Sequence, residues 1–158
     1  MRPLILMLGI TTSATLAATA YLISLSPARA EEDVNAWRLL GAVEIDEVIE
    51  GESYQAIKTF PPGLVASADQ FEITGYVVPI AAEAYMSRFI LVEDPANCPF
   101  CGNAAGYGPV LLVQLKRPIS ELPEFSNVRV SGRIELIDDP KTYEAFRMVD
   151  AVTLPPEG

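Results

Sequence analysis

Hydrophobic and polar residues alternate from residue 70 onward in a way that predicts β-strands. In the stretch Q-F-E-I-T-G-Y-V-V-P, residues 70–79, one face carries apolar residues and a glycine, and the other carries polar residues and a tyrosine. A period of two residues is typical of a strand with one buried face. Pro79 ends the strand because proline cannot donate to the ladder, and Gly75 in mid-strand indicates a bulge or a sharp bend. The residues expected to face inward are Phe71, Ile73, Gly75 and Val77.

Four further strands are predicted downstream, at residues 88–93, 110–115, 128–136 and 146–154. The third of these alternates most clearly, with Val128, Val130, Gly132, Ile134 and Leu136 facing inward. Five strands, two of which contain an internal glycine, predict a mainly β protein with a small closed or half-closed barrel. The OB-fold is the commonest five-stranded barrel of this kind, so we expect an OB-like barrel with a short helical segment before it.

An acidic segment precedes the barrel. Residues 31–52 hold eight acidic side chains and one basic side chain, Arg38. Val34, Trp37 and Leu40 recur at helical spacing, which predicts a short helix that docks its apolar face on the core. A short strand around residues 54–57 and one helical turn at 64–68 are expected next. We therefore divide the chain into an acidic lead segment, 31–68, and a barrel domain, 69–158.

The first 30 residues are typical of a secretory signal peptide. Arg2 precedes an uncharged apolar stretch that runs from residue 4 to residue 25, and Ala28 and Ala30 provide the small residues of a cleavage site. The alternative is an uncleaved membrane anchor, because the apolar stretch is long enough to cross a bilayer. The expected location is the periplasm or the exterior, with inner-membrane anchoring if the segment is retained.

The net charge of the chain limits the classes of partner that it is expected to bind. After residue 30 the sequence contains nine basic and 21 acidic residues, which gives the mature chain a net charge of −12. Such a surface repels phosphate backbones and anionic lipid headgroups. We therefore expect no nucleic-acid partner, and contact with a membrane only through a retained N-terminal segment. An envelope protein with a basic surface, or a metal ion, is the expected partner.

Several motifs together resemble a bacterial family of small exported domains of unknown function. They are the G-Y-x-V-P strand at 75–79, the apolar strand at 89–92, a cysteine loop, G-P-V-L-L-V at 108–113 and V-x-V-S-G-R-I-E-L at 128–136. The resemblance implies an exported protein with an OB-like β core. It assigns structural roles to Gly75, Tyr76, Pro79, Gly102, Gly108 and Pro109. In that family the cysteine is followed by x-His, whereas this chain has Phe100 at that position and contains no histidine, so no imidazole-based role can be carried over.

The only two cysteines, Cys98 and Cys101, form a C-x-x-C motif in a loop rich in glycine and proline. Two thiolates could hold zinc or copper if carboxylates such as Glu93 or Asp94 completed the ligand set. A thiol–disulfide exchange centre is an alternative, although the flanking residues do not favour the helix that lowers the pKa of such a thiol. A purely structural disulfide between the two cysteines is a further alternative, because thiols tend to be oxidised outside the cytoplasm.

No constellation of catalytic residues emerges from the sequence, and none is assigned. The function that the sequence favours is binding rather than catalysis: an exported accessory module that uses the C-x-x-C loop to handle a metal ion or to dock on an envelope complex. A redox-active protein and a structural disulfide remain the alternatives.

Overall fold

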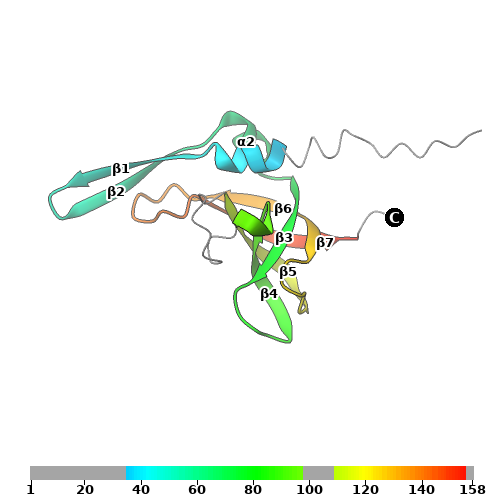
Figure 1. Ribbon diagram of the computed structural model, residues 1–158. Helices are drawn as coiled ribbons and strands as arrows, with labels where there is room; N and C mark the ends of the chain where they lie inside the picture. The colour runs from blue at the N-terminus through cyan, green and yellow to red at the C-terminus, as the bar shows by residue number, and fades with distance from the viewer. Residues whose placement is uncertain (1–34, 98–108, 156–158) are drawn as a thin grey trace, which may run out of the picture.

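The computed structural model describes residues 35–97 and 109–155. Residues 35–41 are helical and are called the lead helix. Nine elements follow it, in the order β1 (Glu44–Glu50), β2 (Ser53–Thr59), α2 (Pro62–Ser67), β3 (Phe71–Pro79), β4 (Tyr85–Val92), the 3-10 helix η1 (Pro95–Asn97), β5 (Val110–Ser120), β6 (Asn127–Leu136) and β7 (Phe146–Leu154). Figure 1 shows that β1 and β2 project away from the other strands.

Strands β3 to β7 form a closed barrel in the order β3-β4-β5-β7-β6, and β6 pairs with β3 to complete it. Every neighbouring pair is antiparallel except β5 and β7, which are parallel. Closure removes free strand edges, which is how small all-β domains avoid unwanted pairing. The prediction of a mainly β protein with a five-stranded, OB-like barrel is thus confirmed.

The alternation predicted for the inward faces of β3 and β6 is confirmed by burial. Phe71, Ile73 and Val77 of β3 are buried, as are Val130 and Ile134 of β6. They form one core together with residues of β4, β5 and β7. Because side chains of a strand point alternately to its two faces, this pattern leaves the intervening residues outside the barrel.

Gly75 and Gly132 have different roles in the two strands. The register between β3 and β6 runs past Gly75 without a shift, so the expected bulge is not found there. Instead, a Cβ atom at Gly75 would lie 2.9 Å from Cζ2 of Trp37 and 2.7 Å from the carbonyl oxygen of Val92. At Gly132 the register with β7 does shift, and Asp150 on the opposite strand has a positive φ of 54°. Glycine therefore allows close packing in β3, and in β6 it lies opposite a bulge of β7, where Asp150 and Ala151 face the single residue Gly132.

The lead helix contributes to the barrel core. Ala36, Trp37 and Leu40 are buried in the same core cluster as the barrel strands. The indole Nε1 of Trp37 donates a hydrogen bond to the backbone carbonyl of Thr74, at 2.8 Å. This agrees with the helical spacing of the apolar residues in the sequence. Leu64 of α2, which is fully buried, joins the same cluster.

The strand boundaries differ most from the predicted ones at the start of β4 and the end of β5. β4 begins at Tyr85 rather than at residue 88, and β5 continues to Ser120 rather than ending at residue 115. Between Gln114 and Ile119 the pairing of β5 with β4 is interrupted. Pro118 lies in this interval, where a missing N–H breaks no ladder bond, and proline is tolerated for that reason.

Candidate functional site

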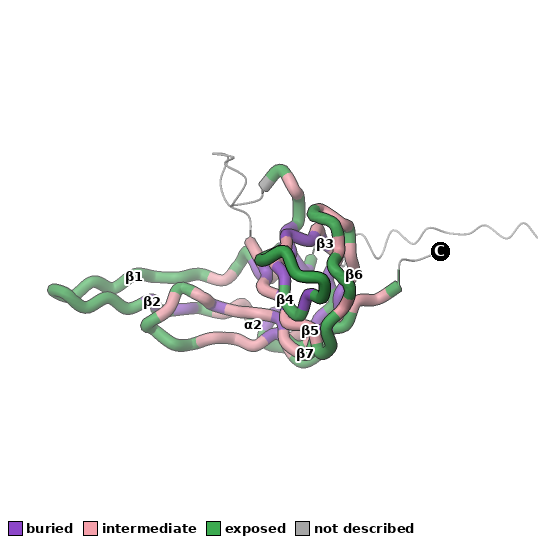
Figure 2. Tube along the Cα trace, turned by 90° about the horizontal axis from the view of Figure 1, so that it is seen from below, coloured by how far each residue is buried: buried purple, intermediate pink, exposed green. Residues whose placement is uncertain are grey.

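The β1–β2 hairpin, residues 44–59, projects from the barrel and is called the arm. All seven residues of β1 are exposed, and in β2 only Ala56 and Lys58 are buried. Figure 2 shows the arm as a long exposed segment beside the compact barrel. The turn consists of Gly51 and Glu52, and Gly51 has a φ of 61°. A two-residue loop that starts with a glycine at positive φ is a common hairpin connection, because its twist matches that of the strands.

The arm is fixed by the connection between β6 and β7, residues 137–145, which we call the clamp loop. Three residues of β2 that lie on one face bind three successive carbonyl groups of this loop. The Tyr54 hydroxyl donates to the carbonyl of Lys141, the Ala56 N–H to that of Pro140, and the Lys58 ammonium to that of Asp139. The clamp loop therefore lies along the outer edge of β2, as the neighbouring traces in Figure 1 illustrate.

An aromatic contact strengthens this attachment. The rings of Tyr54 and Tyr143 are stacked, with 5.3 Å between their centroids and 16° between their planes. The Tyr143 hydroxyl also donates a hydrogen bond to a carboxylate oxygen of Glu47. This hydrogen bond, together with the negative charge of Glu47, raises the pKa of Tyr143 to about 12, because ionisation would remove the donated proton. Tyr143 thus contacts both strands of the arm.

A groove of about 400 Å³ lies where the arm meets the barrel, and we call it the rim groove. Its walls come from the lead helix and the segment after it, from β1, β4 and β5, and from the clamp loop with the start of β7. The lining residues are Leu40, Gly41, Val43, Ile45, Ile90, Pro109, Val110, Leu112, Tyr143, Glu144, Ala145 and Phe146. Most of these side chains are apolar, which is typical of ligand and peptide sites.

The connection that carries the cysteines begins and ends at one rim of the barrel, and its downstream end lines the rim groove. Val92, at the end of β4, pairs with Val110, at the start of β5, so both ends of the connection lie at one rim of the barrel. Cys98 and Cys101, with Gly102 and Gly108, lie outside the described residues, and the predictions made for them stay predictions. Pro109, which is described, lines the groove.

The two carboxylates proposed to accompany the cysteines have different surroundings. Both Glu93 and Asp94 are exposed. Oδ1 of Asp94 accepts a hydrogen bond of 2.8 Å from the N–H of Ala96, at the start of η1. Asp94 thus stabilises a local turn, as aspartate often does. Within residues 35–97 and 109–155, no group of three or more acidic, cysteine or histidine side chains is placed to hold a metal ion.

The residues Tyr76 and Pro79, to which the resemblance gave structural roles, lie in β3. Tyr76 is half-buried and packs with Val78, Val92, Ile90, Val110 and Phe125 in a small cluster apart from the main core. Pro79 is the last residue of β3 and pairs with Phe89. Neither residue lines the rim groove, although Ile90 and Val110 of the Tyr76 cluster do.

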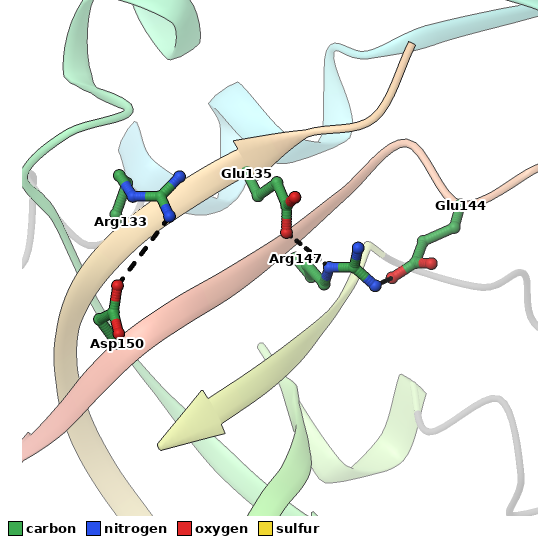
Figure 3. A network of polar contacts seen from close by, with 5 residues as sticks. All are labelled: Arg133, Glu135, Glu144, Arg147 and Asp150. Carbon is green, nitrogen blue, oxygen red and sulfur yellow. Dashed lines mark hydrogen bonds and ion pairs between the residues drawn. The ribbon is translucent and has the colours of Figure 1, made fainter. Parts of the chain in front are cut away.

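A polar network covers the β6–β7 pair. Arg147 binds Glu135, with 2.8 Å between Nε and Oε2, and lies 3.6 Å from Oε1 of Glu144, while Arg133 lies 3.9 Å from Asp150 (Figure 3). The hydrogen bond from Arg147 lowers the pKa of Glu135 and raises that of Arg147. The Arg147–Glu135 and Arg133–Asp150 pairs join β6 to β7, and partly exposed ion pairs of this kind contribute little to stability.

The sequence predicts only one of the two strands of the arm. The strand expected around residues 54–57 is β2, whereas the acidic segment E-I-D-E-V-I-E, for which no strand is predicted, forms β1. A signal was present: two runs rich in β-branched residues are separated by two residues that begin with glycine, which is typical of a hairpin. The density of acidic residues, which disfavour strands, concealed it.

In the part of the chain that the structure describes, no helix is long and apolar enough to cross a membrane. Comparisons of the chain with protein-family models, with curated proteins and with solved structures find no match.

Proposed function

We propose that this chain is an accessory binding module of the bacterial envelope that docks on a partner protein through the arm and the adjoining rim groove. The observation that carries the proposal is the arm itself. It is a two-stranded ribbon, exposed except at Ala56 and Lys58, that is fixed to a closed barrel by the clamp loop. An export signal at residues 1–30 and the resemblance to exported domains support the location, and both remain predictions.

The composition of the arm supports a contact role. An isolated two-stranded hairpin is marginally stable in water, yet this one exposes five large apolar side chains: Ile45, Val48, Ile49, Tyr54 and Ile57. Ile49 is the most exposed of them, at 69%. Ile45, Ile49 and Tyr54 share one face of the ribbon, and exposed apolar side chains on a projecting element are typical of a protein–protein interaction site. The rim groove extends this apolar surface because Ile45 belongs to both.

Charge determines which partners suit the arm. Residues 44–59 contain five acidic side chains and one basic side chain, Lys58, which is buried. The arm thus presents a negative surface with apolar residues between the charges. Such a surface favours a basic protein partner through steering of the encounter and disfavours nucleic acid and anionic membranes.

The test is a comparison of two surface variants of the mature chain as bait for an envelope extract. The double variant Val48→Ser/Ile49→Ser removes apolar area from the arm. The control Ile80→Ser/Val152→Ser removes exposed apolar area elsewhere, since Ile80 and Val152 are 47% and 44% exposed. We expect the arm variant to bind its partner protein with an affinity about tenfold lower, which corresponds to about 1.4 kcal/mol of binding free energy. Equal retention by both variants would refute the proposal.

The cysteine segment carries a second proposed role, metal handling by Cys98 and Cys101. It is favoured by the position of both ends of the segment beside the rim groove and the exposed Glu93. Thiol–disulfide exchange and a structural disulfide are the competing roles. Protein purified from the periplasm should contain zinc or copper with reduced thiols if metal handling is correct. A metal-free disulfide reducible near the envelope redox potential would favour exchange, and a resistant one would favour a structural role.

A further inference from the structure

The two edges of the arm differ in their hydrogen bonding. In an antiparallel pair, the N–H and C=O of a residue point either both toward the partner strand or both away from it, and the two kinds alternate. Ala56 pairs with Glu47, and the N–H of Ala56 donates to Pro140 of the clamp loop instead of to β1. The N–H and C=O of Glu47 therefore point away from β2, and by alternation so do those of Ile45 and Ile49.

Among the described residues, hydrogen bonds from outside the hairpin cover only one of these edges. The clamp loop lies along β2 and accepts the N–H of Ala56, at 2.8 Å. Along β1, no backbone hydrogen bond to Ile45, Glu47 or Ile49 comes from any other described residue outside the hairpin. A free strand edge of this length is a template for pairing with another chain, and natural proteins normally protect it. Here it is displayed on a projecting ribbon.

The side chains of β1 define what could pair with it. One face of the strand carries Glu44, Asp46, Val48 and Glu50, and the other carries Ile45, Glu47 and Ile49. The carboxylate of Glu47 already accepts the hydroxyl of Tyr143. An added strand places its side chains alternately beside these two faces. A partner strand therefore complements β1 when its side chains are alternately basic and apolar. The basic side chains then lie beside the face with Glu44, Asp46 and Glu50, and the apolar ones beside the face with Ile45 and Ile49.

We infer that β1 binds an extended segment of a partner protein along its free edge, by strand addition, and that this segment alternates basic and apolar residues. The inference rests on the docking role proposed above and specifies its geometry and partner chemistry. Main-chain hydrogen bonds supply the attachment, and the two faces of β1 supply the specificity, as in other strand-addition complexes.

A second copy of this chain is a poor occupant of the same edge. Pairing β1 with another β1 would bring Glu44, Asp46 and Glu50 against an identical acidic set, and like charges opposite each other destabilise a sheet. The mature chain also has nine basic residues against 21 acidic ones, so copies repel each other as a whole. The charge of the arm therefore selects a different chain.

The probe is a capped synthetic peptide, Lys-Val-Lys-Val-Lys-Val-Lys, whose length matches the seven residues of β1. The readout is amide hydrogen exchange followed by NMR on the mature chain. Saturating peptide should slow exchange at Ile45, Glu47 and Ile49 by about tenfold or more, because these amides gain a partner. Exchange at Asp46 and Val48 should change little, since their amides already bond to β2.

Three controls separate strand addition from charge attraction. A peptide with glutamate in place of lysine tests the charge match. A peptide N-methylated on alternate residues cannot donate to the edge. Raising the salt concentration from 0.05 to 0.5 M should weaken binding by about tenfold, because exposed charges are screened.

A matched pair of variants tests the edge itself. Ile49→Pro removes an N–H that faces the partner and not β2, so the hairpin should remain intact. Ile49→Val keeps that N–H and the β-branched side chain. We expect peptide affinity to fall by about fivefold or more in Ile49→Pro and to change less than about twofold in Ile49→Val. Retention of the high pKa of Tyr143 in both variants shows that the arm is still attached to the clamp loop.

Two results would overturn the inference: protection that appears only outside β1, or equal affinity of the lysine, glutamate and N-methylated peptides. Failure of the docking role is a separate outcome. If the arm variant Val48→Ser/Ile49→Ser still loses its envelope partner while the peptide protects no edge amide, docking holds and strand addition is wrong. If neither effect occurs, docking itself is wrong.

Discussion

Replacement of Gly75 by alanine tests how tightly the lead helix is packed into the barrel. The added Cβ would lie 2.7 Å from the carbonyl oxygen of Val92, 2.8 Å from Cγ of Leu91 and 2.9 Å from Cζ2 of Trp37. All three distances are shorter than ordinary carbon contacts. Val92 is paired with both Tyr76 and Val110, so its carbonyl cannot withdraw without disturbing the ladder.

The expected cost follows from two opposing effects. Adding a methyl group to a packed core costs about 1–3 kcal/mol through displaced neighbours. Replacing glycine by alanine also lowers the conformational entropy of the unfolded chain, which stabilises the folded state by about 0.4–1 kcal/mol. We therefore expect Gly75→Ala to lower the free energy of unfolding by about 1–2 kcal/mol, with a fall in Tm of roughly 4–8 °C for a domain of this size.

Urea unfolding followed by far-UV circular dichroism measures this cost. Trp37 is the only tryptophan in the chain, so its fluorescence separately reports whether the lead helix stays docked. A double-mutant cycle with Trp37→Leu isolates the contact with the indole. In that background Gly75→Ala should cost about 1 kcal/mol less, because the Cζ2 contact is gone and only the contacts with Leu91 and Val92 remain.

The reasoning would be refuted by a Gly75→Ala variant that unfolds within about 0.3 kcal/mol of the wild type, since the packing cost would then be missing. An equal cost in both backgrounds would show that the indole does not set the requirement for glycine. In that case the clashes with Leu91 and Val92 would account for it.

Three further predictions concern the arm. The pKa of Tyr143, about 12 in the folded chain, should fall toward 10 in Glu47→Gln, as measured by ultraviolet absorbance titration; a value unchanged by the substitution would show that Glu47 is not the cause. This pKa is raised above its unfolded value. The stability that the Tyr143 hydroxyl contributes is therefore fully present below pH 10 and is lost as the pH rises through about 12. In Tyr143→Phe, the free energy of unfolding should no longer fall for this reason between pH 10 and pH 12. Gly51→Ala should speed amide exchange in β1 and β2 by about tenfold, because a φ of 61° costs an L-residue about 1–2 kcal/mol, and Gly51→Asn should show a smaller effect, while exchange in the barrel core stays as in the wild type.

The barrel could be predicted from the sequence because its strands follow a strong local rule. The alternation in 71–77 and 128–136 identifies buried faces without reference to the rest of the chain, and the same residues form the core. The role of Gly75 could not be predicted in this way. Its need for glycine arises from Trp37, 38 residues earlier in the sequence, and from Val92 on the next strand, so only the assembled fold reveals it.

The candidate site is less predictable because it depends on contacts between distant segments. The groove combines the segment after the lead helix with β4, β5 and the clamp loop, and no motif links these parts. The arm had a sequence signal in its glycine turn, but its attachment did not, since the carbonyl groups of 139–141 carry no side-chain signature. The parallel pairing of β5 with β7 also could not be predicted, because alternation identifies a strand but not its neighbours in the sheet.

The burial of Trp37 beneath Gly75 has a consequence for how the chain reaches its native state. The indole cannot find its hydrogen-bond acceptor until the strand that carries Thr74 exists, and that strand is closed by β6, far downstream. We expect the lead helix to dock after the strands have paired, because its core contacts lie on the assembled barrel. A shortened chain that begins at residue 69 would have nothing to fill this space, and it should collapse loosely and bind hydrophobic dyes.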